Sequence, residues 1–204
     1  MRPLVFTVLM LAGGAPPALH GQPAVPELDR KAWVLKQTLG PASLAGGVFS
    51  AGLTTWRARP VEYDTHWKGF GQRFGIRLSG VATQNAMEAG LGAMWREDPR
   101  YRRAASGSFR ARFGSALKQT LLVQRADGSY QPAYARYAAI GGANFISNAW
   151  RPDSQATVSA ALARTGIGFL GRLAGNTFAE FGGGFRSRLR GRKTSPPPPV
   201  VKKP

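Results

Sequence analysis

Four stretches of the sequence are rich in small and apolar residues and poor in charge, and they constrain the fold most strongly. They cover residues 39–56, 76–95, 137–150 and 158–181. Each stretch is long enough for a helix of several turns. Together with an amphipathic segment over 108–123, they predict a mostly α-helical chain, a compact bundle of about five Gly/Ala-rich helices.

Small residues recur at helical spacing within three of these stretches. They are Ser43, Gly47, Ala51 and Thr55 in the first, Ala82, Ala86 and Gly90 in the second, and Ala163, Gly171 and Gly175 in the fourth. Because residues four apart share a helix face, small side chains there let two helix backbones approach closely. We therefore expect these faces to form helix contacts, either membrane-like ones or those of a compact soluble bundle.

The segment 108–123 has a different pattern, with large apolar residues on one side of the helical wheel. These are Phe109, Phe113, Leu117 and Leu121. The pattern predicts an ordinary amphipathic helix, whose apolar stripe faces a core. Asp127 and Gly128 then favour a turn, so Tyr130, Tyr134 and Tyr137 belong either to a short strand returning on residues 121–125 or to the next helix. One short β-hairpin is therefore an option.

Residues 1–21 have the pattern of a secretory signal peptide. Arg2 is followed by an uncharged apolar run over 4–12, and glycines and prolines then interrupt it. The run is too short to span a bilayer, although an uncleaved anchor is the alternative. We expect an exported protein, periplasmic or associated with the outer membrane, in which residues 22–184 form a single helical domain.

The C-terminal segment 185–204 is basic and rich in proline, and we expect it to be disordered. The whole chain has 28 Lys and Arg against 10 Asp and Glu, a formal net charge of +18. Such charge favours membrane surfaces or envelope polyanions as partners, namely lipid head groups or cell-wall polymers. The expected polyanion-binding residues are Arg186, Arg188, Arg190, Arg192 and Lys193.

Tryptophan is followed directly by arginine at the ends of three apolar stretches. The pairs are Trp56 and Arg57, Trp95 and Arg96, and Trp150 and Arg151. An indole ring prefers the membrane–water boundary, and a neighbouring arginine can reach phosphate head groups. We expect these six residues to act as membrane-interface anchors. In the alternative interpretation, each tryptophan covers the end of a helical core while the arginine faces water.

Residues for catalysis are scarce. The chain has no cysteine and two histidines, which excludes thiolate catalysis, disulfides and sites with several histidine ligands. His66 has no serine motif of a catalytic triad near it. Glu97 and Asp98 are the one adjacent acidic pair, and Arg100 follows closely. We expect a local ion-pair cluster, no enzyme activity, no cofactor and no metal; a hydrolase using Glu97 or Asp98 is the weakest alternative.

Several motifs together resemble those of a family of uncharacterised bacterial exported proteins. They lie at residues 69–75 (GFGQRFG), 97–101 (EDPRY), 145–153 (FISNAWRPD) and 175–181 (GNTFAEF). The resemblance covers about residues 60–182. It implies an envelope address and a shared fold, and it brings no activity, ligand or site residue. We expect a non-enzymatic envelope protein, structural or membrane-associated; the alternative is a basic nucleic-acid-binding protein whose N-terminus is not a leader.

Overall fold

The structure is a computed structural model, and it describes residues 28–104, 107–124 and 129–191. The helices are α1 (Arg30–Leu39), α2 (Pro41–Trp56), α3 (Trp67–Met94), α4 (Phe109–Leu121), α5 (Tyr134–Ile146) and α6 (Val158–Gly191). Two short 3-10 helices, η1 (Ser147–Trp150) and η2 (Asp153–Gln155), connect α5 to α6. The expected signal peptide lies outside the described residues.

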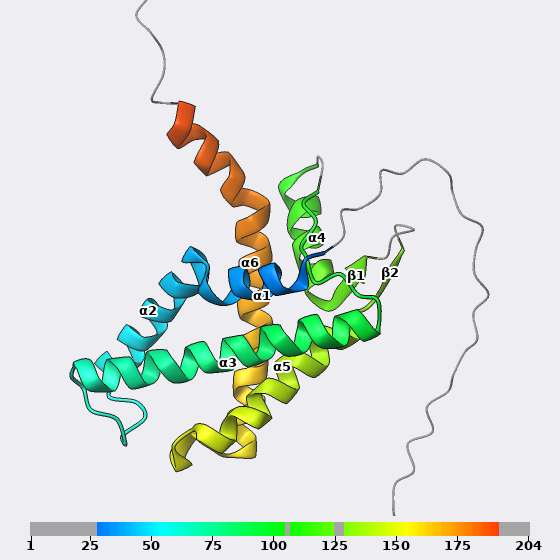
Figure 1. The fold of residues 1–204 in the computed structure, drawn as a ribbon. Coiled ribbons are helices and arrows are strands. Elements are labelled where there is room, and N and C mark those ends of the chain that lie inside the picture. Colours follow the sequence, from blue (N-terminus) through cyan, green and yellow to red (C-terminus); the bar gives the residue numbers. More distant parts are fainter. Residues whose placement is uncertain (1–27, 105–106, 125–128, 192–204) are drawn as a thin grey trace, which may run out of the picture.

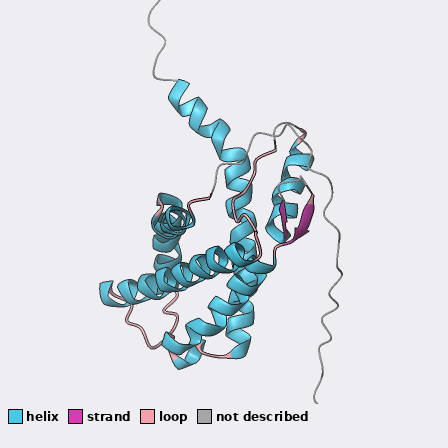
Figure 2. Cartoon of the chain, turned by 45° about the vertical axis from the view of Figure 1, so that its right-hand side comes forward, coloured by secondary structure: helices cyan, strands magenta, loops and turns pink. Residues whose placement is uncertain are grey.

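Helix α3 crosses the middle of the molecule, and most other helices pack along it (Figure 1). Helices α1, α2 and α5 contact α3 directly. Helix α6 contacts α5 with its first half and α4 with its second half, and its last turns stand clear of the other helices (Figures 1 and 2). The expectation of a mostly helical bundle is confirmed.

The short hairpin is also confirmed. Strand β1 (Leu122–Gln124) pairs antiparallel with β2 (Tyr130–Pro132), with Val123 opposite Gln131. The hairpin lies beside α4 (Figure 2). Of the two interpretations of Tyr130, the strand is correct.

The element boundaries differ from the sequence-based expectation at three places. Helix α1 was not expected, and α3 starts nine residues before the predicted stretch, at Trp67. Helix α6 continues through Gly182, Gly183 and Gly184 to Gly191, past the expected start of the tail, and residues 192–204 lie outside the described part of the chain.

One of the three small-residue faces packs as expected. Gly47 lies against α3, where an added Cβ would come within 2.7 Å of the Phe74 ring and 3.0 Å of the Arg77 guanidinium. Most of the other two faces points outward, because Ala86, Gly90, Ala163, Gly171 and Gly175 are exposed and Ala82 is half-buried. Within the described part of the chain, these exposed residues do not bring two helices together.

The core is built from alanine and from charged side chains. Its buried apolar residues are Trp33, Ala51, Ala89, Ala116, Val123, Ala133, Ala135, Ala139, Ile140, Ala143 and Ala161. Buried beside them are Arg73, Glu88, Glu97, Arg136 and Glu180. Alanine buries little apolar area, so hydrogen bonds and ion pairs carry an unusual share of the specificity of this core.

Helices α2 and α3 end in the same way. The N–H of Arg59 donates to the carbonyl of Thr54 at 2.9 Å, and the N–H of Glu97 donates to that of Gly92 at 2.8 Å. The residues before these donors, Ala58 and Arg96, have φ of 49° and 55°. Both ends are therefore Schellman motifs, which close the helix with a residue in the left-handed region.

Candidate functional site

A buried ion-pair cluster joins α3, α5 and α6. Glu88 Oε1 accepts hydrogen bonds from Arg136 Nε at 3.0 Å and from Arg172 Nη2 at 2.8 Å. Arg136 Nη1 also donates to the carbonyls of Gln119 at 2.6 Å and Thr120 at 3.1 Å, at the end of α4. Burial lowers the pKa of Arg172 to about 10, against the attraction of Glu88. These ion pairs and hydrogen bonds connect α3, α5, α6 and the end of α4 in the interior of the bundle.

A second cluster is centred on Glu180, which is 0% exposed. Its carboxylate accepts from Arg112 Nε at 2.8 Å, from the Tyr101 hydroxyl at 2.7 Å and from the Ala104 N–H at 3.1 Å. Burial raises the pKa of Glu180, but these hydrogen bonds outweigh burial and hold the pKa below its usual value. Burial and Glu180 raise the pKa of Tyr101 to about 12. Glu180 thus ties α6 to α4 and to residues 101–104.

The acidic pair does not form a joint site. Glu97 is buried and accepts from the N–H groups of Tyr134 at 3.0 Å and Ala135 at 3.2 Å, so it caps the start of α5. Asp98 pairs instead with Arg100 at 2.7 Å. The expected ion-pair cluster therefore holds for Asp98 and is wrong for Glu97. Burial raises the pKa of Glu97 despite its two hydrogen bonds.

His66 lies exposed on the loop before α3, with Nδ1 2.6 Å from an oxygen of Asp64. This hydrogen bond raises the pKa of His66. In the described part of the chain, no cluster of three or more His, Cys, Asp or Glu side chains could bind a metal ion.

Helix α6 shows the reverse of the usual burial pattern between residues 158 and 182. Its three charged residues, Arg164, Arg172 and Glu180, all make hydrogen bonds to neighbouring elements. Five of its large apolar residues are exposed instead, namely Val158, Leu162, Ile167, Leu170 and Phe178, while Phe169, Leu173 and Phe181 are half-buried. Phe178 is 68% exposed. The outward side of this helix therefore carries no charge.

The apolar side of α6 continues onto α4. Phe109 stacks on Phe113 at 6.3 Å between ring centroids and on Phe181 at 5.0 Å. A groove of about 630 Å³ between the two helices is lined by Phe113, Leu170, Leu173, Ala174, Thr177, Phe178, Phe181 and Gly182. We call the set Phe109, Phe113, Leu170, Leu173, Ala174, Phe178 and Phe181 the α4/α6 apolar surface.

This arrangement corrects the expectation for residues 108–123. The helix is amphipathic, but its apolar stripe of Phe109, Phe113, Leu117 and Leu121 is exposed. The side of α4 that contacts the bundle carries Ala116, Gln119 and Thr120, all buried. Gln119 exchanges two hydrogen bonds with the backbone of Arg102, which explains why a polar side can pack inward.

The three Trp–Arg pairs lie at separate places. Trp56 and Arg57 are exposed at the end of α2, beside the start of α3 (Figure 1). Trp95 and exposed Arg96 lie at the other end of α3, about 40 Å away by helix length. Trp95 contacts Tyr134 edge-on, with 6.5 Å between the ring centroids.

The third pair differs from the other two. Trp150 ends η1, and Arg151 donates to Ser147 Oγ and Gln155 Oε1, both at 3.0 Å. Its guanidinium is thus already engaged within the protein. Of the expected polyanion-binding residues, Arg186, Arg188 and Arg190 belong to the last turns of α6, and Arg192 and Lys193 lie outside the described residues.

The exposure of Leu170 and Phe178 was not predicted from the sequence. The signal was present, because every fourth residue from 164 to 180 faces inward: Arg164, Gly168, Arg172, Asn176 and Glu180.

None of the described helices is long and apolar enough to cross a membrane. Three comparisons were made, with family models, with curated proteins and with solved structures, and none of them found a match for this chain.

Proposed function

We propose that this chain is a non-enzymatic exported envelope protein that associates with an anionic membrane through the α4/α6 apolar surface. The observation that carries the proposal is the reversed pattern of α6, with charges inward and Leu170 and Phe178 outward. A contiguous exposed apolar patch marks an interaction surface, because burying it outside water is favourable. A bilayer interface offers such an environment to helices that lie along it.

The charge of the chain favours an anionic membrane over a neutral one. The formal net charge is +18, and Arg186, Arg188 and Arg190 continue along the same helix beyond the apolar surface. Each basic residue near an anionic surface contributes on the order of 1 kcal/mol, and salt screens this attraction. Insertion of apolar side chains would account for the binding that persists at high salt.

Two of the Trp–Arg pairs fit this role as interface anchors. Trp56 with Arg57, and Trp95 with Arg96, are exposed at helix ends, where their side chains could reach lipid head groups. Export to the envelope rests on the leader-like residues 1–21.

Vesicle sedimentation of the full chain tests the proposal. Vesicles of phosphatidylglycerol and phosphatidylethanolamine are compared with vesicles of phosphatidylcholine at low salt and at about 1 M salt. We expect binding to the anionic vesicles that persists in part at high salt. Leu170→Asp combined with Phe178→Asp should remove the salt-resistant part, because each carboxylate would have to enter the interface.

The matched control is Val61→Asp combined with Val48→Asp, which places the same two charges at exposed apolar residues outside the α4/α6 apolar surface. It should bind vesicles like the wild type. Equal binding by the α6 double variant, or complete release of the wild type by salt, would contradict docking through the apolar surface.

A further inference from the structure

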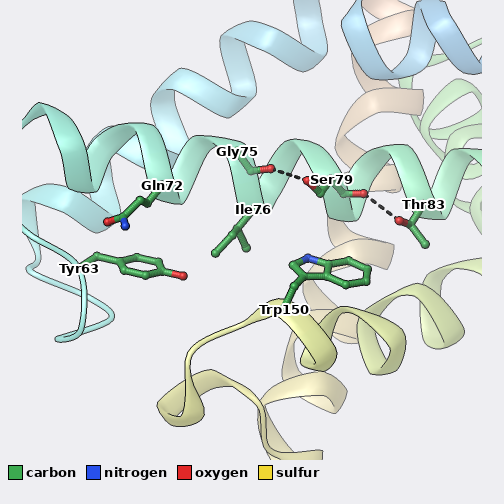
Figure 3. Close-up of a pocket in the computed structure, with 7 residues that line it drawn as sticks. All are labelled: Tyr63, Gln72, Gly75, Ile76, Ser79, Thr83 and Trp150. Carbon is green, nitrogen blue, oxygen red and sulfur yellow. Dashed lines mark hydrogen bonds between the residues drawn. The ribbon is translucent and has the colours of Figure 1, made fainter.

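A second cavity lies along α3, away from the α4/α6 apolar surface. It is open, measures about 670 Å³ and is lined by Tyr63, Gln72, Gly75, Ile76, Ser79, Thr83 and Trp150. Figure 3 shows the Tyr63 ring near one end of the cavity and the Trp150 indole near the other, with the Ile76 side chain directed between them. Helix α3 supplies one side, and two loops supply the aromatic rings.

The lining of this cavity is uncharged and rich in hydrogen-bonding groups. The hydroxyl of Ser79 donates to the carbonyl of Gly75, and that of Thr83 to the carbonyl of Ser79, both at 2.9 Å (Figure 3). Because these protons are engaged within the helix, the two oxygens offer lone pairs to a ligand. The Gln72 amide and the Tyr63 hydroxyl can both donate and accept, and the Trp150 indole N–H can donate.

The loop that carries Tyr63 is held in place by Arg73. This buried side chain donates to four carbonyls of the loop: Arg59 at 2.7 Å, Pro60 at 3.2 Å, Tyr63 at 3.1 Å and Asp64 at 2.6 Å. Its guanidinium also lies 5.6 Å from the centre of the Tyr63 ring. One buried arginine thus fixes both the backbone and the ring on this side of the cavity.

The turn that carries Trp150 is fixed by two further arginines. Arg151 binds Ser147 and Gln155, and Arg164 donates to Asn148 Oδ1 at 2.5 Å and to the Gln155 carbonyl at 2.8 Å.

The two loops are also joined to each other. Glu62 accepts from the N–H of Ser154 at 3.2 Å and from its hydroxyl at 2.9 Å. These contacts hold the backbone of both segments, and the Tyr63 ring, in position before a ligand arrives. Such preorganisation lowers the entropic cost of binding.

We propose that this cavity binds a sugar ring of a glycan. The C–H face of a pyranose is apolar with slight positive charge on its hydrogens, which suits the negative face of an indole. Its hydroxyls both donate and accept, and they match the amide and hydroxyl groups between the two rings. The lining holds no Asp, Glu, His or Lys side chain, so we assign the site to binding and not to cleavage.

Calorimetric titration of the full chain with neutral tetrasaccharides tests this inference. The probes are the β-linked glucose, α-linked glucose and β-linked N-acetylglucosamine oligomers, with adenosine as a flat, aromatic competitor. We expect at least one tetrasaccharide to bind saturably. Trp150→Ala should weaken it about tenfold or more, as expected for loss of a central aromatic contact.

Two further variants keep the test sharp. Trp67→Ala is the matched control, because Trp67 is 85% exposed on α3, the helix that forms one side of the cavity, and lies outside the cavity lining. This variant should bind the tetrasaccharide with the affinity of the wild type. Gln72→Ala removes an exposed side chain whose loss leaves the fold intact, and it should weaken binding several-fold.

Three results would overturn the proposal. The first is the absence of saturable binding for all three tetrasaccharides. The second is unchanged affinity in both Trp150→Ala and Gln72→Ala. The third is binding of adenosine with the same Trp150 dependence while the sugars do not bind, which would assign the cavity to a planar heterocycle. None of these results bears on vesicle binding, which involves different residues.

Discussion

Glu88 on α3 and Arg136 on α5 form an ion pair in the interior of the bundle, with 3.0 Å between Oε1 and Nε and with Glu88 only 2% exposed. The pair joins residues 48 positions apart in the sequence. Arg172 adds a second cation to the same oxygen. The three side chains connect α3, α5 and α6 where an ordinary bundle would place leucine or isoleucine.

Glu88→Ala should lower the free energy of unfolding by about 3–5 kcal/mol, because it leaves two buried guanidinium groups without their counter-charge. Urea denaturation followed by circular dichroism measures this loss. Arg110→Ala, at an exposed position of α4, is the control and should change stability little. A loss below about 1 kcal/mol in Glu88→Ala would show that the cluster does not hold the helices together.

The stabilisation from Glu180 should depend on pH. Its pKa is lowered in the folded protein, from 4.5 in an unfolded chain. The contribution of the ionised group is therefore fully present above pH 4.5 and is lost as the pH falls through the lower folded pKa. The difference in free energy of unfolding between the wild type and Glu180→Gln should shrink on acidification below pH 4.5.

Glu97 supplies a comparison of opposite sign. Its pKa is raised by burial, so the folded state binds a proton more tightly than the unfolded chain does. The wild type should therefore gain stability relative to Glu97→Gln as the pH falls toward 4.5. Denaturation curves at several pH values measure both differences; a change in the same direction for both variants would contradict the two assignments.

Adding one methyl group at Gly47 should disturb the contact between α2 and α3, whereas adding one at Gly52 should not. An added Cβ at Gly47 would lie 2.7 Å from the Phe74 ring, whereas nothing lies within 4 Å at Gly52. Gly47→Ala should destabilise the protein by about 1–3 kcal/mol through overpacking. Gly52→Ala should be neutral or stabilise by up to about 1 kcal/mol, since alanine favours helix. Thermal melts compare the two, and equal effects would be inconsistent with this contact.

The left-handed residue after α2 offers a stabilising change. Ala58 has φ of 49°, which costs a residue with a Cβ about 1–2 kcal/mol and costs glycine nothing. Ala58→Gly should therefore raise the free energy of unfolding by up to about 1 kcal/mol after the added chain entropy is counted. Ala45→Gly, at an exposed position inside α2, should lower it by about 0.5–1 kcal/mol. The opposite order of the two variants would exclude the Schellman ending.

The sequence was sufficient to predict the described helices other than α1 and to offer the hairpin as one of two options, because charge-poor stretches and turn residues are local signals. An aspartate followed by a proline is a common start of a helix, yet Asp98 and Pro99 begin none. Glu97 instead binds the start of α5, Asp98 binds Arg100, and Tyr101 binds Glu180 of α6. Contacts with distant residues overrode the local signal there.

The direction in which each helix faces was less predictable. Helical spacing shows that Phe109 and Phe113 share a side of α4, but it does not show which side neighbours cover. The partners that bring polar residues inward are remote, as with Arg112 and Glu180, 68 positions apart. In α6 the four-residue repeat from Arg164 to Glu180 marks the inward side. The sequence shows the repeat, but the structure is needed to show that its charged residues bind neighbouring elements.

Fractionation of cells expressing the full chain tests whether the protein is exported and inserted at a membrane. Intact-mass analysis of the N-terminus is combined with a wash of the membrane fraction at about 1 M salt. We expect a chain cleaved near residue 21 that remains on the membrane after the wash. An uncleaved chain in the cytosol would contradict it and favour the nucleic-acid-binding alternative, and a cleaved chain fully released by salt would contradict insertion of the α4/α6 apolar surface.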